Sequence, residues 1–185
     1  MARARAEPGV LALGIDADAS RMAVAASRAA RKPARGGVAN ARFLVCAAEA
    51  LPAELGCSAD LVTITFPWGS LLRGVVTGDP AVVLPIVDLL KPSGAALRLL
   101  LSVEQRDGSL GVPALDVRAM ADVAARLEDI GLVVTATRSA TAADLAAGHS
   151  TWARRLGIGR GDRRAWLLTA RRGPGEGRRM NGAGR

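Results

Sequence analysis

A buried strand is predicted at Val10-Leu11-Ala12-Leu13-Gly14-Ile15-Asp16, an apolar run that ends in an acid. Asp18 or Ser20 can cap the helix that follows, and Pro33 stops this helix after about residue 31. The alternation continues, with strands predicted at about residues 42–47, 60–66, 95–103, 131–138 and 164–171 and helices at about 68–75, 80–90, 115–130 and 140–147. Strands that alternate with helices predict an α/β fold with a mostly parallel sheet. No long helix separates the last two strands, which favours an antiparallel strand at the sheet edge.

Length and composition are those of one globular domain. The chain has 185 residues, half of them hydrophobic, which is enough for a sizeable core. No apolar stretch reaches the roughly 18 residues of a membrane span, and the basic start is not followed by the apolar segment of a signal peptide. We therefore expect a cytoplasmic protein that does not bind membranes. Residues 1–172 are predicted to form one domain, and residues 173–185 a basic, disordered tail.

The usual catalytic and metal-binding side chains are scarce. Cys46 and Cys57 lack zinc-ligand spacing, so they are interpreted as reduced, mostly buried thiols, and no metal site is expected. His149 is the sole histidine, which argues against Ser-His-Asp and Cys-His hydrolases unless it is itself the base. A histidine of this kind is more often a surface or packing residue.

The positive charge lies in two separate blocks. The formal net charge is +8. Residues 19–48 hold six basic side chains and no acids, and residues 150–185 hold ten arginines against two acids. The residues between these blocks carry a net negative charge. Charge gathered in this way suits a phosphate-binding face and favours a nucleic acid as partner. The alternative is that arginine enrichment simply reflects a G+C-rich genome.

Two of the three tryptophans stand beside turn residues and arginines. Trp68 ends an apolar run in Thr65-Phe66-Pro67-Trp68-Gly69-Ser70, and Trp152 occurs in Ser150-Thr151-Trp152-Ala153-Arg154-Arg155. An indole is a favourable flat surface for stacking a base, which is our interpretation of this pair. Core packing is the alternative for both. It is the preferred interpretation of Trp166, which alternates within a strand-like run.

Five landmarks occur together in this chain: Gly14-Ile15-Asp16; Arg31-Lys32-Pro33 with Gly36-Gly37 and Asn40; Ala47-Ala48-Glu49-Ala50-Leu51-Pro52; Phe66-Pro67-Trp68-Gly69-Ser70-Leu71-Leu72; and Ser150-Thr151-Trp152-Ala153-Arg154-Arg155-Leu156. In this order they closely resemble the KamB/NpmA aminoglycoside-resistance methyltransferases, over about residues 11–171. The resemblance implies a class I, Rossmann-like methyltransferase fold. It also implies transfer of a methyl group from S-adenosylmethionine to N1 of adenine 1408 of 16S rRNA in the 30S subunit. A monomer is expected.

The resemblance further implies roles for individual residues. Asp16 would bind the cofactor ribose, and the small side chains after the next strand would flank its adenine. The implied cofactor-binding residues are Asp16, Ala47, Ala48, Glu49, Phe66 and Ser70. The residues implied to position the target base are Trp68, Trp152 and Ser150, with the two indoles on either side of a flipped adenine. The residues implied to contact rRNA are Arg28, Arg31, Lys32, Arg35, Arg154, Arg155 and Arg160.

Each of these roles has a simpler alternative. Asp16 could be a surface or capping acid, although Asp18 fits the capping role better. Glu49 could only complement a helix dipole. The two serines could be turn residues, and some of the arginines could be solvated surface residues.

The chain departs from the family pattern at its start. The family begins with a strand and a Gly-rich loop around the methionine part of the cofactor, whereas residues 1–6 resemble the end of the helix that follows that loop. Because the first strand is central in a doubly wound sheet, we expect a gap between the strands at Leu11 and Leu61. A start site assigned too far downstream is the preferred explanation.

Three other functions remain open at this point. One is a related methyltransferase that acts on tRNA or on another rRNA site, against which the paired tryptophans argue. Another is a catalytically impaired RNA-binding remnant that lacks the cofactor loop. A Rossmann oxidoreductase is disfavoured because the sequence has no GxGxxG loop.

Overall fold

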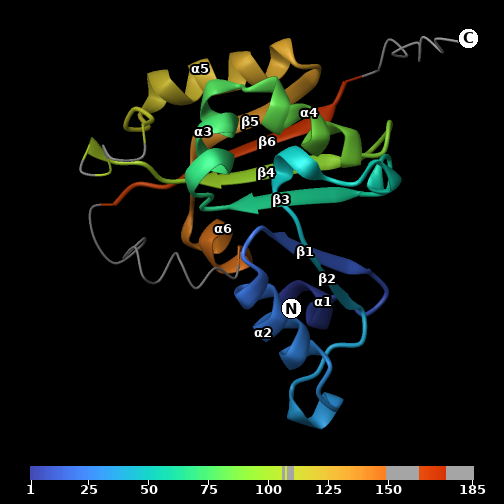
Figure 1. Ribbon diagram of the computed structural model, residues 1–185. Helices are drawn as coiled ribbons and strands as arrows, with labels where there is room; N and C mark the ends of the chain where they lie inside the picture. Colours follow the sequence, from blue (N-terminus) through green and yellow to red (C-terminus); the bar gives the residue numbers. More distant parts are fainter. Residues whose placement is uncertain (106, 108–110, 149–162, 174–185) are drawn as a thin grey trace, which may run out of the picture. The chain divides into compact units, whose positions relative to one another are not determined.

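The computed structural model describes residues 1–105, 107, 111–148 and 163–173. The chain divides into two compact units, residues 1–51 and 52–185, and each is described by itself (Figure 1). The prediction of one domain over residues 1–172 is not tested by this division. The predicted tail lies outside the described residues, apart from its first residue, Gly173.

The first unit is built on a two-stranded parallel sheet. Its elements are α1 (Ala2–Ala6), β1 (Ala12–Asp16), α2 (Ala19–Ala29), the short 3-10 helix η1 (Pro33–Arg35), β2 (Ala41–Val45) and the 3-10 helix η2 (Ala48–Ala50). β1 and β2 run side by side from Ala12 opposite Ala41 to Asp16 opposite Val45. A small core holds them to the helices, and its residues are Ala4, Ala29, Val38 and Ala41, with Met1, Ala12 and Phe43 packed against them.

Two polar side chains fix the ends of these elements. The Asp18 carboxylate accepts a hydrogen bond from the Arg21 amide at 3.0 Å, which confirms the predicted cap of α2. The Asn40 side-chain amide donates to the carbonyls of Ala4, Glu7 and Val10 at 2.8, 3.1 and 2.7 Å. Asn40 therefore ties α1 to the segment that leads into β1.

The second unit is a four-stranded mixed sheet with helices on both sides. Its elements are the 3-10 helix η3 (Ala53–Leu55), β3 (Leu61–Thr65), α3 (Gly69–Thr77), α4 (Pro80–Leu89), β4 (Ala96–Leu101), α5 (Val117–Asp129), β5 (Leu132–Ser139), α6 (Ala142–Ala147) and β6 (Trp166–Arg172). The strand order is β3-β4-β6-β5. Figure 1 shows α3, α4 and α5 on one side of this sheet and α6 on the other. The α/β fold class predicted from the sequence is confirmed.

The antiparallel strand lies one place further in than predicted. β6 runs antiparallel to both β4 and β5 and is inserted between them, so β5 forms the edge. The burial of β6 explains this position. Trp166, Leu167, Leu168 and Ala170 are all at most 5% exposed, as expected for a strand that has a paired neighbour on each side and cover on both faces, whereas an edge strand lacks one of these neighbours.

The strands next to Leu11 and at Leu61, β1 and β3, belong to different sheets, and a gap between them stays a prediction. Among the described residues β1 pairs only with β2, and β3 pairs only with β4. In the doubly wound order 3-2-1-4-5 the first strand lies between the second and the fourth. The pairs β2-β1 and β3-β4 both occur as neighbours in this order.

The two cysteines and the lengths of the helices can be compared with the expectations from composition. Cys46 is half-buried, but Cys57 is exposed in the turn after η3, so the prediction of mostly buried thiols is wrong for Cys57; both thiols are free. The left-handed φ of 52° at Cys57 keeps this residue in a surface turn. Among the described residues, no single helix is long and apolar enough to cross a membrane, and only α3 and α4 together, bent by 90°, meet the length and composition test.

Candidate active site

In the first unit, the predicted cofactor residues gather at the carboxyl ends of β1 and β2. Asp16 ends β1 and is half-buried; its Oδ1 accepts the Asp18 amide at 2.9 Å, and its backbone carbonyl accepts the Cys46 amide at 3.1 Å. Oδ2 of Asp16 accepts no hydrogen bond from the described residues. Ala47 and Ala48 follow β2, half-buried, and Glu49 is exposed. This edge therefore offers a carboxylate oxygen beside small side chains, which suits a ribose and an adenine ring.

In the second unit, the Phe66–Ser70 segment follows β3 in a strained turn. The Phe66 amide still donates to the Leu100 carbonyl at 2.8 Å, but the residue has a φ of 50°, which is rare for an aromatic residue. Pro67 is buried, and Gly69 has a φ of 59° before α3 begins. Trp68 is 44% exposed between them. Strain of this kind is common where backbone positions a functional side chain.

Phe66 begins this turn and is buried, whereas Ser70 follows it and is exposed. The Phe66 side chain is 4% exposed and packs with Leu100, Ala165 and Leu167, so its role is to hold the turn against the sheet. Ser70 is exposed in the first turn of α3. Trp166 is 5% exposed, and its indole N–H donates to the Leu115 carbonyl at 2.9 Å, which confirms the predicted core role.

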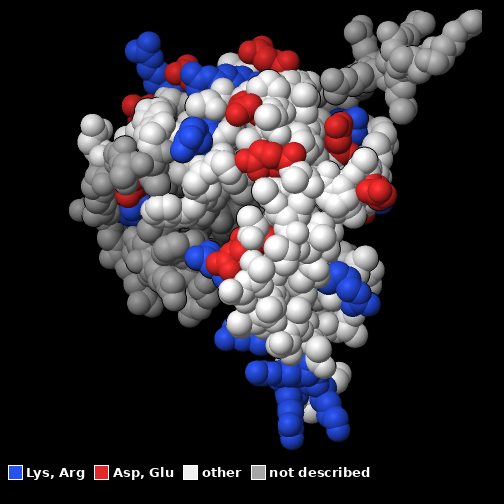
Figure 2. All heavy atoms as spheres, in the orientation of Figure 1, with Lys and Arg blue, Asp and Glu red and all other residues white. Residues whose placement is uncertain are grey.

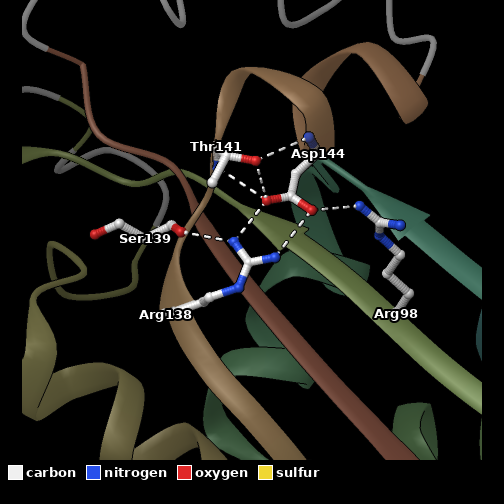
Figure 3. Close-up of polar contacts among 5 residues, drawn as sticks. All are labelled: Arg98, Arg138, Ser139, Thr141 and Asp144. Carbon is white, nitrogen blue, oxygen red and sulfur yellow. Dashed lines mark hydrogen bonds and ion pairs between the residues drawn. The ribbon is translucent and has the colours of Figure 1, made fainter.

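A charged cluster that the sequence analysis did not identify holds α6 to the sheet (Figure 3). The Asp144 carboxylate accepts from Arg98 of β4 at 2.9 Å and from Arg138 of β5 at 2.6 and 3.1 Å. It also accepts from the amide and hydroxyl of Thr141 at 2.8 and 2.7 Å, while the Thr141 hydroxyl accepts the Asp144 amide. These hydrogen bonds hold the pKa of Asp144 far below its usual range, and the bond from Arg138 is the largest cause.

The cluster places the end of α6 at the carboxyl ends of β3 and β4. Gly148 follows α6, and a Cβ added there would lie 2.9 Å from Leu100 Cδ1 and 3.3 Å from Thr65 Cγ2. Thr65 directly precedes Phe66 in the chain. The residue after α6 is thus packed one position away from the turn that carries Trp68.

A second charged network lies at the carboxyl end of β4. Arg163 is 8% exposed, pairs with Asp107, and donates from Nε to Ser102 Oγ at 2.9 Å. Ser102 Oγ in turn donates to the Arg164 carbonyl at 2.7 Å. The chain just before β6 is therefore fixed to the loop that follows β4.

Comparison with known proteins identifies the family. The family described as "NpmA: 16S rRNA (adenine(1408)-N(1))-methyltransferase" matches residues 1–171. The chain belongs to this family of methyltransferases. It is 33% identical to the 16S rRNA (adenine(1408)-N(1))-methyltransferase of Streptoalloteichus hindustanus over 161 residues, which is 85% of this chain and 74% of that protein. A shorter match, 38% over 94 residues, covers 51% of this chain and 43% of the Streptoalloteichus tenebrarius enzyme.

Solved structures of the same family share the fold. A mutant of the 16S rRNA (adenine(1408)-N(1))-methyltransferase from Catenulisporales acidiphilia, solved with cosubstrate SAM, matches with a TM-score of 0.81 and 34% identity, over 93% of this chain and 79% of that one. The 16S rRNA methyltransferase KamB also matches with a TM-score of 0.81, at 30% identity, over 94% of this chain and 81% of that one.

The predicted rRNA-binding residues of this methyltransferase divide between described and undescribed parts of the chain. Arg28 lies in the last turn of α2, and Arg31, Lys32 and Arg35 are exposed around η1. Figure 2 shows blue side chains and no red ones at the end of the first unit where η1 lies. The other three, Arg154, Arg155 and Arg160, lie outside the described part, as do Ser150 and Trp152, which were predicted to position the target base.

No metal site is found in the described part of the methyltransferase, since nowhere in it do three His, Cys, Asp or Glu side chains come together. The Cys46 thiol donates to the Ala47 and Ala50 carbonyls at 3.1 and 2.9 Å, so it serves the turn at η2.

Proposed function

We propose that this chain methylates N1 of adenine 1408 of 16S rRNA in the 30S subunit, with Trp68 as one wall of the target-base pocket. The observation that carries this role is the exposure of Trp68 on a strained turn at the carboxyl end of β3. Open α/β sheets bind their ligands at this edge. An indole that served only packing would be buried, as Trp166 is.

Trp152 is the proposed second wall. It lies four residues after Gly148 in the sequence, and four residues span at most about 14 Å. Because Gly148 packs on Thr65 and Leu100, Trp152 is within reach of the turn that holds Trp68. Ser150 falls between Gly148 and Trp152, where its hydroxyl can orient the base or hold the loop.

The proposed chemistry requires positioning rather than a catalytic base. S-adenosylmethionine supplies an electrophilic methyl group on a sulfonium. The N1 lone pair of the target adenine is the nucleophile, so no side chain has to remove a proton. The methylated base carries a positive charge, and two indole faces stabilise it by about 0.5 to 2 kcal/mol each through cation–π attraction. The remaining task is to hold the flipped adenine in line with the methyl group.

The first unit is proposed to bind the cofactor. Asp16 Oδ2 would accept hydrogen bonds from the ribose hydroxyls, while Ala47 and Ala48 leave space for the adenine ring and Glu49 lies beside it. Phe66 and Ser70 are the other two residues proposed to bind the cofactor, and both belong to the second unit. These residues fit the group because one carboxylate oxygen of Asp16 accepts no hydrogen bond from the described residues and the alanines are small.

The arginines and Lys32 are proposed to contact rRNA phosphates, which fix the enzyme on the assembled subunit. Arg28, Arg31, Lys32 and Arg35 would act from the first unit, and Arg154, Arg155 and Arg160 from the segment that contains Trp152. We further propose that the enzyme acts as a monomer in the cytoplasm, where 30S subunits are assembled.

Methyl transfer to isolated 30S subunits tests the proposal. The chain, and a version extended upstream of Met1, are incubated with labelled S-adenosylmethionine, and the product is mapped by primer extension, which N1-methyladenine blocks. A stop at adenine 1408 is the expected result. Trp68→Ala should abolish the stop, whereas Val133→Ala, at a side chain that is 48% exposed on β5, should leave it unchanged. Binding to the subunit without transfer by either version would instead indicate an RNA-binding remnant.

A further inference from the structure

A hollow of about 460 Å³ opens in the first unit between α2, the loop around η1 and β2. Small apolar side chains make up most of its wall, and two arginines and one aromatic ring complete it. The lining residues are Ala26, Ala29, Ala30, Arg31, Pro33, Val38, Ala39, Ala41, Arg42 and Phe43. Their composition combines a flat apolar surface with positive charge.

Phe43 supplies a fixed aromatic surface in this hollow. Its ring lies across Gly14 of β1, where an added Cβ would be only 3.1 Å from Phe43 Cδ1. The absence of a side chain at Gly14 therefore lets the ring lie close to the sheet. An aromatic ring held in this way can stack with a base at little cost in side-chain entropy.

The loop that forms one wall is closed tightly by its own backbone. The Val38 amide donates to the Ala29 carbonyl at 2.9 Å, and the Arg35 amide donates to the Lys32 carbonyl at 2.8 Å. Gly37 lies so near the Arg31 backbone that an added Cβ would overlap the Arg31 carbonyl oxygen. The wall is thus held by hydrogen bonds of its own backbone.

The charges around the hollow suit an anion. Arg42 donates from one guanidinium nitrogen to the carbonyls of Ala39 and Ala41, both at 2.9 Å, which holds its side chain in place. Arg31 is exposed at the same hollow, and residues 19–48 contain no acid. A guanidinium that is already held loses less conformational freedom when it binds a phosphate.

We propose that this hollow binds one unstacked nucleotide of the RNA substrate. The base would stack on Phe43 beside the exposed Ala26 and Ala30, and Arg31 and Arg42 would hold the adjoining phosphates. A ligand that is flat and apolar on one side and carries phosphates on the other matches both parts of the lining. The inference rests on the proposed function, because it takes rRNA to be the partner, and it adds a second nucleotide site distinct from that of the target adenine.

A matched pair of substitutions in α2 tests the site. Ala26→Leu fills the hollow, whereas Ala23→Leu adds the same side chain at an exposed position of the same helix outside the lining. Alanine and leucine both favour helices, so neither change should unfold α2. Affinity for 30S subunits is measured by filter binding. The loss of one stacked base should weaken binding by Ala26→Leu about tenfold or more, and Ala23→Leu should bind as the unchanged protein does.

Equal affinity of the two variants for 30S subunits would overturn the proposal, provided that the unchanged protein binds and methylates the subunit. Failure of the unchanged protein to bind would count instead against the proposed function. The test therefore distinguishes failure of the proposed nucleotide site from failure of the proposed function.

Nucleoside monophosphates give a second measurement that needs no ribosome. Methyl resonances of Ala26, Ala29 and Ala30 are followed by NMR during titration with adenosine monophosphate, adenosine and a short single-stranded RNA. Shifts are expected with the RNA and the monophosphate, and weaker shifts with the nucleoside. In Ala26→Leu the methyl resonances of Ala29 and Ala30 should not shift with any of the three ligands. Shifts with the monophosphate but none with the RNA would indicate a free-nucleotide site and would overturn the RNA assignment. The absence of shifts with all three ligands would also overturn it.

Discussion

At the scale of single residues, the Asp144 carboxylate accepts five hydrogen bonds. One carboxylate of a residue that is 8% exposed accepts from two guanidiniums and from Thr141. Removing its charge leaves Arg98 and Arg138 without their shared partner. The side chains of Arg138 and Arg98 are 46% and 29% exposed and that of Asp144 only 10%, so these pairs are partly buried, and loss of one member costs more than in a fully exposed pair.

We expect Asp144→Asn to lower the free energy of unfolding by about 1 to 3 kcal/mol, because two guanidiniums lose a charged acceptor. Urea denaturation followed by circular dichroism measures this. Asp60→Asn is the control, since Asp60 pairs with Lys91 at 2.6 Å but its side chain is 81% exposed. That change should cost less than about 1 kcal/mol. An equal loss of unfolding free energy in Asp144→Asn and Asp60→Asn would contradict the stabilising role given to Asp144.

The contribution of Asp144 should depend on pH in one direction. Its pKa is lowered in the folded protein from an ordinary value of 3.8, so folding is favoured by the ionised carboxylate above about pH 4. As the pH falls below that value, the unfolded chain takes up the proton first, and the stabilisation is lost. The difference in Tm between the unchanged protein and Asp144→Asn should therefore narrow in acid. A difference that widens below pH 4 would be the opposite of this expectation.

The same scale shows what a sequence can tell about a site. The capping role of Asp18 and the core position of Trp166 follow from local pattern, and both are confirmed. The Thr141-x-x-Asp144 spacing is a capping-box pattern that could have identified the start of α6. Nothing local pairs Asp144 with Arg98, which lies 46 residues away. Nor does the motif around Phe66 reveal that its side chain is buried and its backbone left-handed.

At the scale of elements, the loop around η1 is the clearest case of backbone closure. Gly37 is the residue that permits it, because any side chain there would overlap the Arg31 carbonyl. Gly37→Ala should open the loop and expose the Val38 amide, which donates to Ala29 in the intact structure. Hydrogen exchange of the Val38 amide, read by NMR, should accelerate at least tenfold.

Gly9→Ala is the matched control for this change, since an added Cβ at Gly9 meets nothing within 4 Å. It should leave the exchange of Val38 as it is. An unchanged rate in Gly37→Ala would show that the loop can reclose around a side chain, and it would weaken the argument that the close approach of Gly37 to Arg31 holds the wall.

The long elements were predictable and the short ones were not. Each of the predicted strands and helices is present, with ends that differ by a few residues, because apolar periodicity and caps are local signals. The 3-10 helices η1, η2 and η3 were not predicted. Three residues carry too little periodicity to show a turn of this kind. The internal position of β6 depends on its pairing with β4 on one side and β5 on the other, and such long-range pairing leaves no local signal in the sequence.

At the scale of the whole molecule, the two units have unequal cores. The first unit has two strands and a core made largely of alanine, and Leu11 and Leu13 remain 68% and 41% exposed on or next to β1. The second unit buries large side chains, with Leu90, Leu99 and Leu101 all fully covered. A two-stranded sheet is marginally stable in water without further packing.

We therefore expect the amides of β1 and β2 to exchange with solvent much faster than those of β4 and β6. Hydrogen–deuterium exchange with mass spectrometry resolves peptides from each unit. A difference of at least tenfold in rate is expected, because opening of the first unit exposes less apolar surface. Equal protection in both units would indicate that they unfold together.

Lys32 has a practical consequence that follows from its setting. The chain contains only two lysines, and the other, Lys91, is bound to Asp60 at 2.6 Å. An amine-acylating reagent at limiting dose will therefore label Lys32, apart from the amino terminus. The extent of its labelling, read by mass spectrometry with and without 30S subunits, reports whether the loop around η1 is covered when the enzyme docks. Labelling of Lys32 therefore detects docking on the 30S subunit without any substitution in the protein.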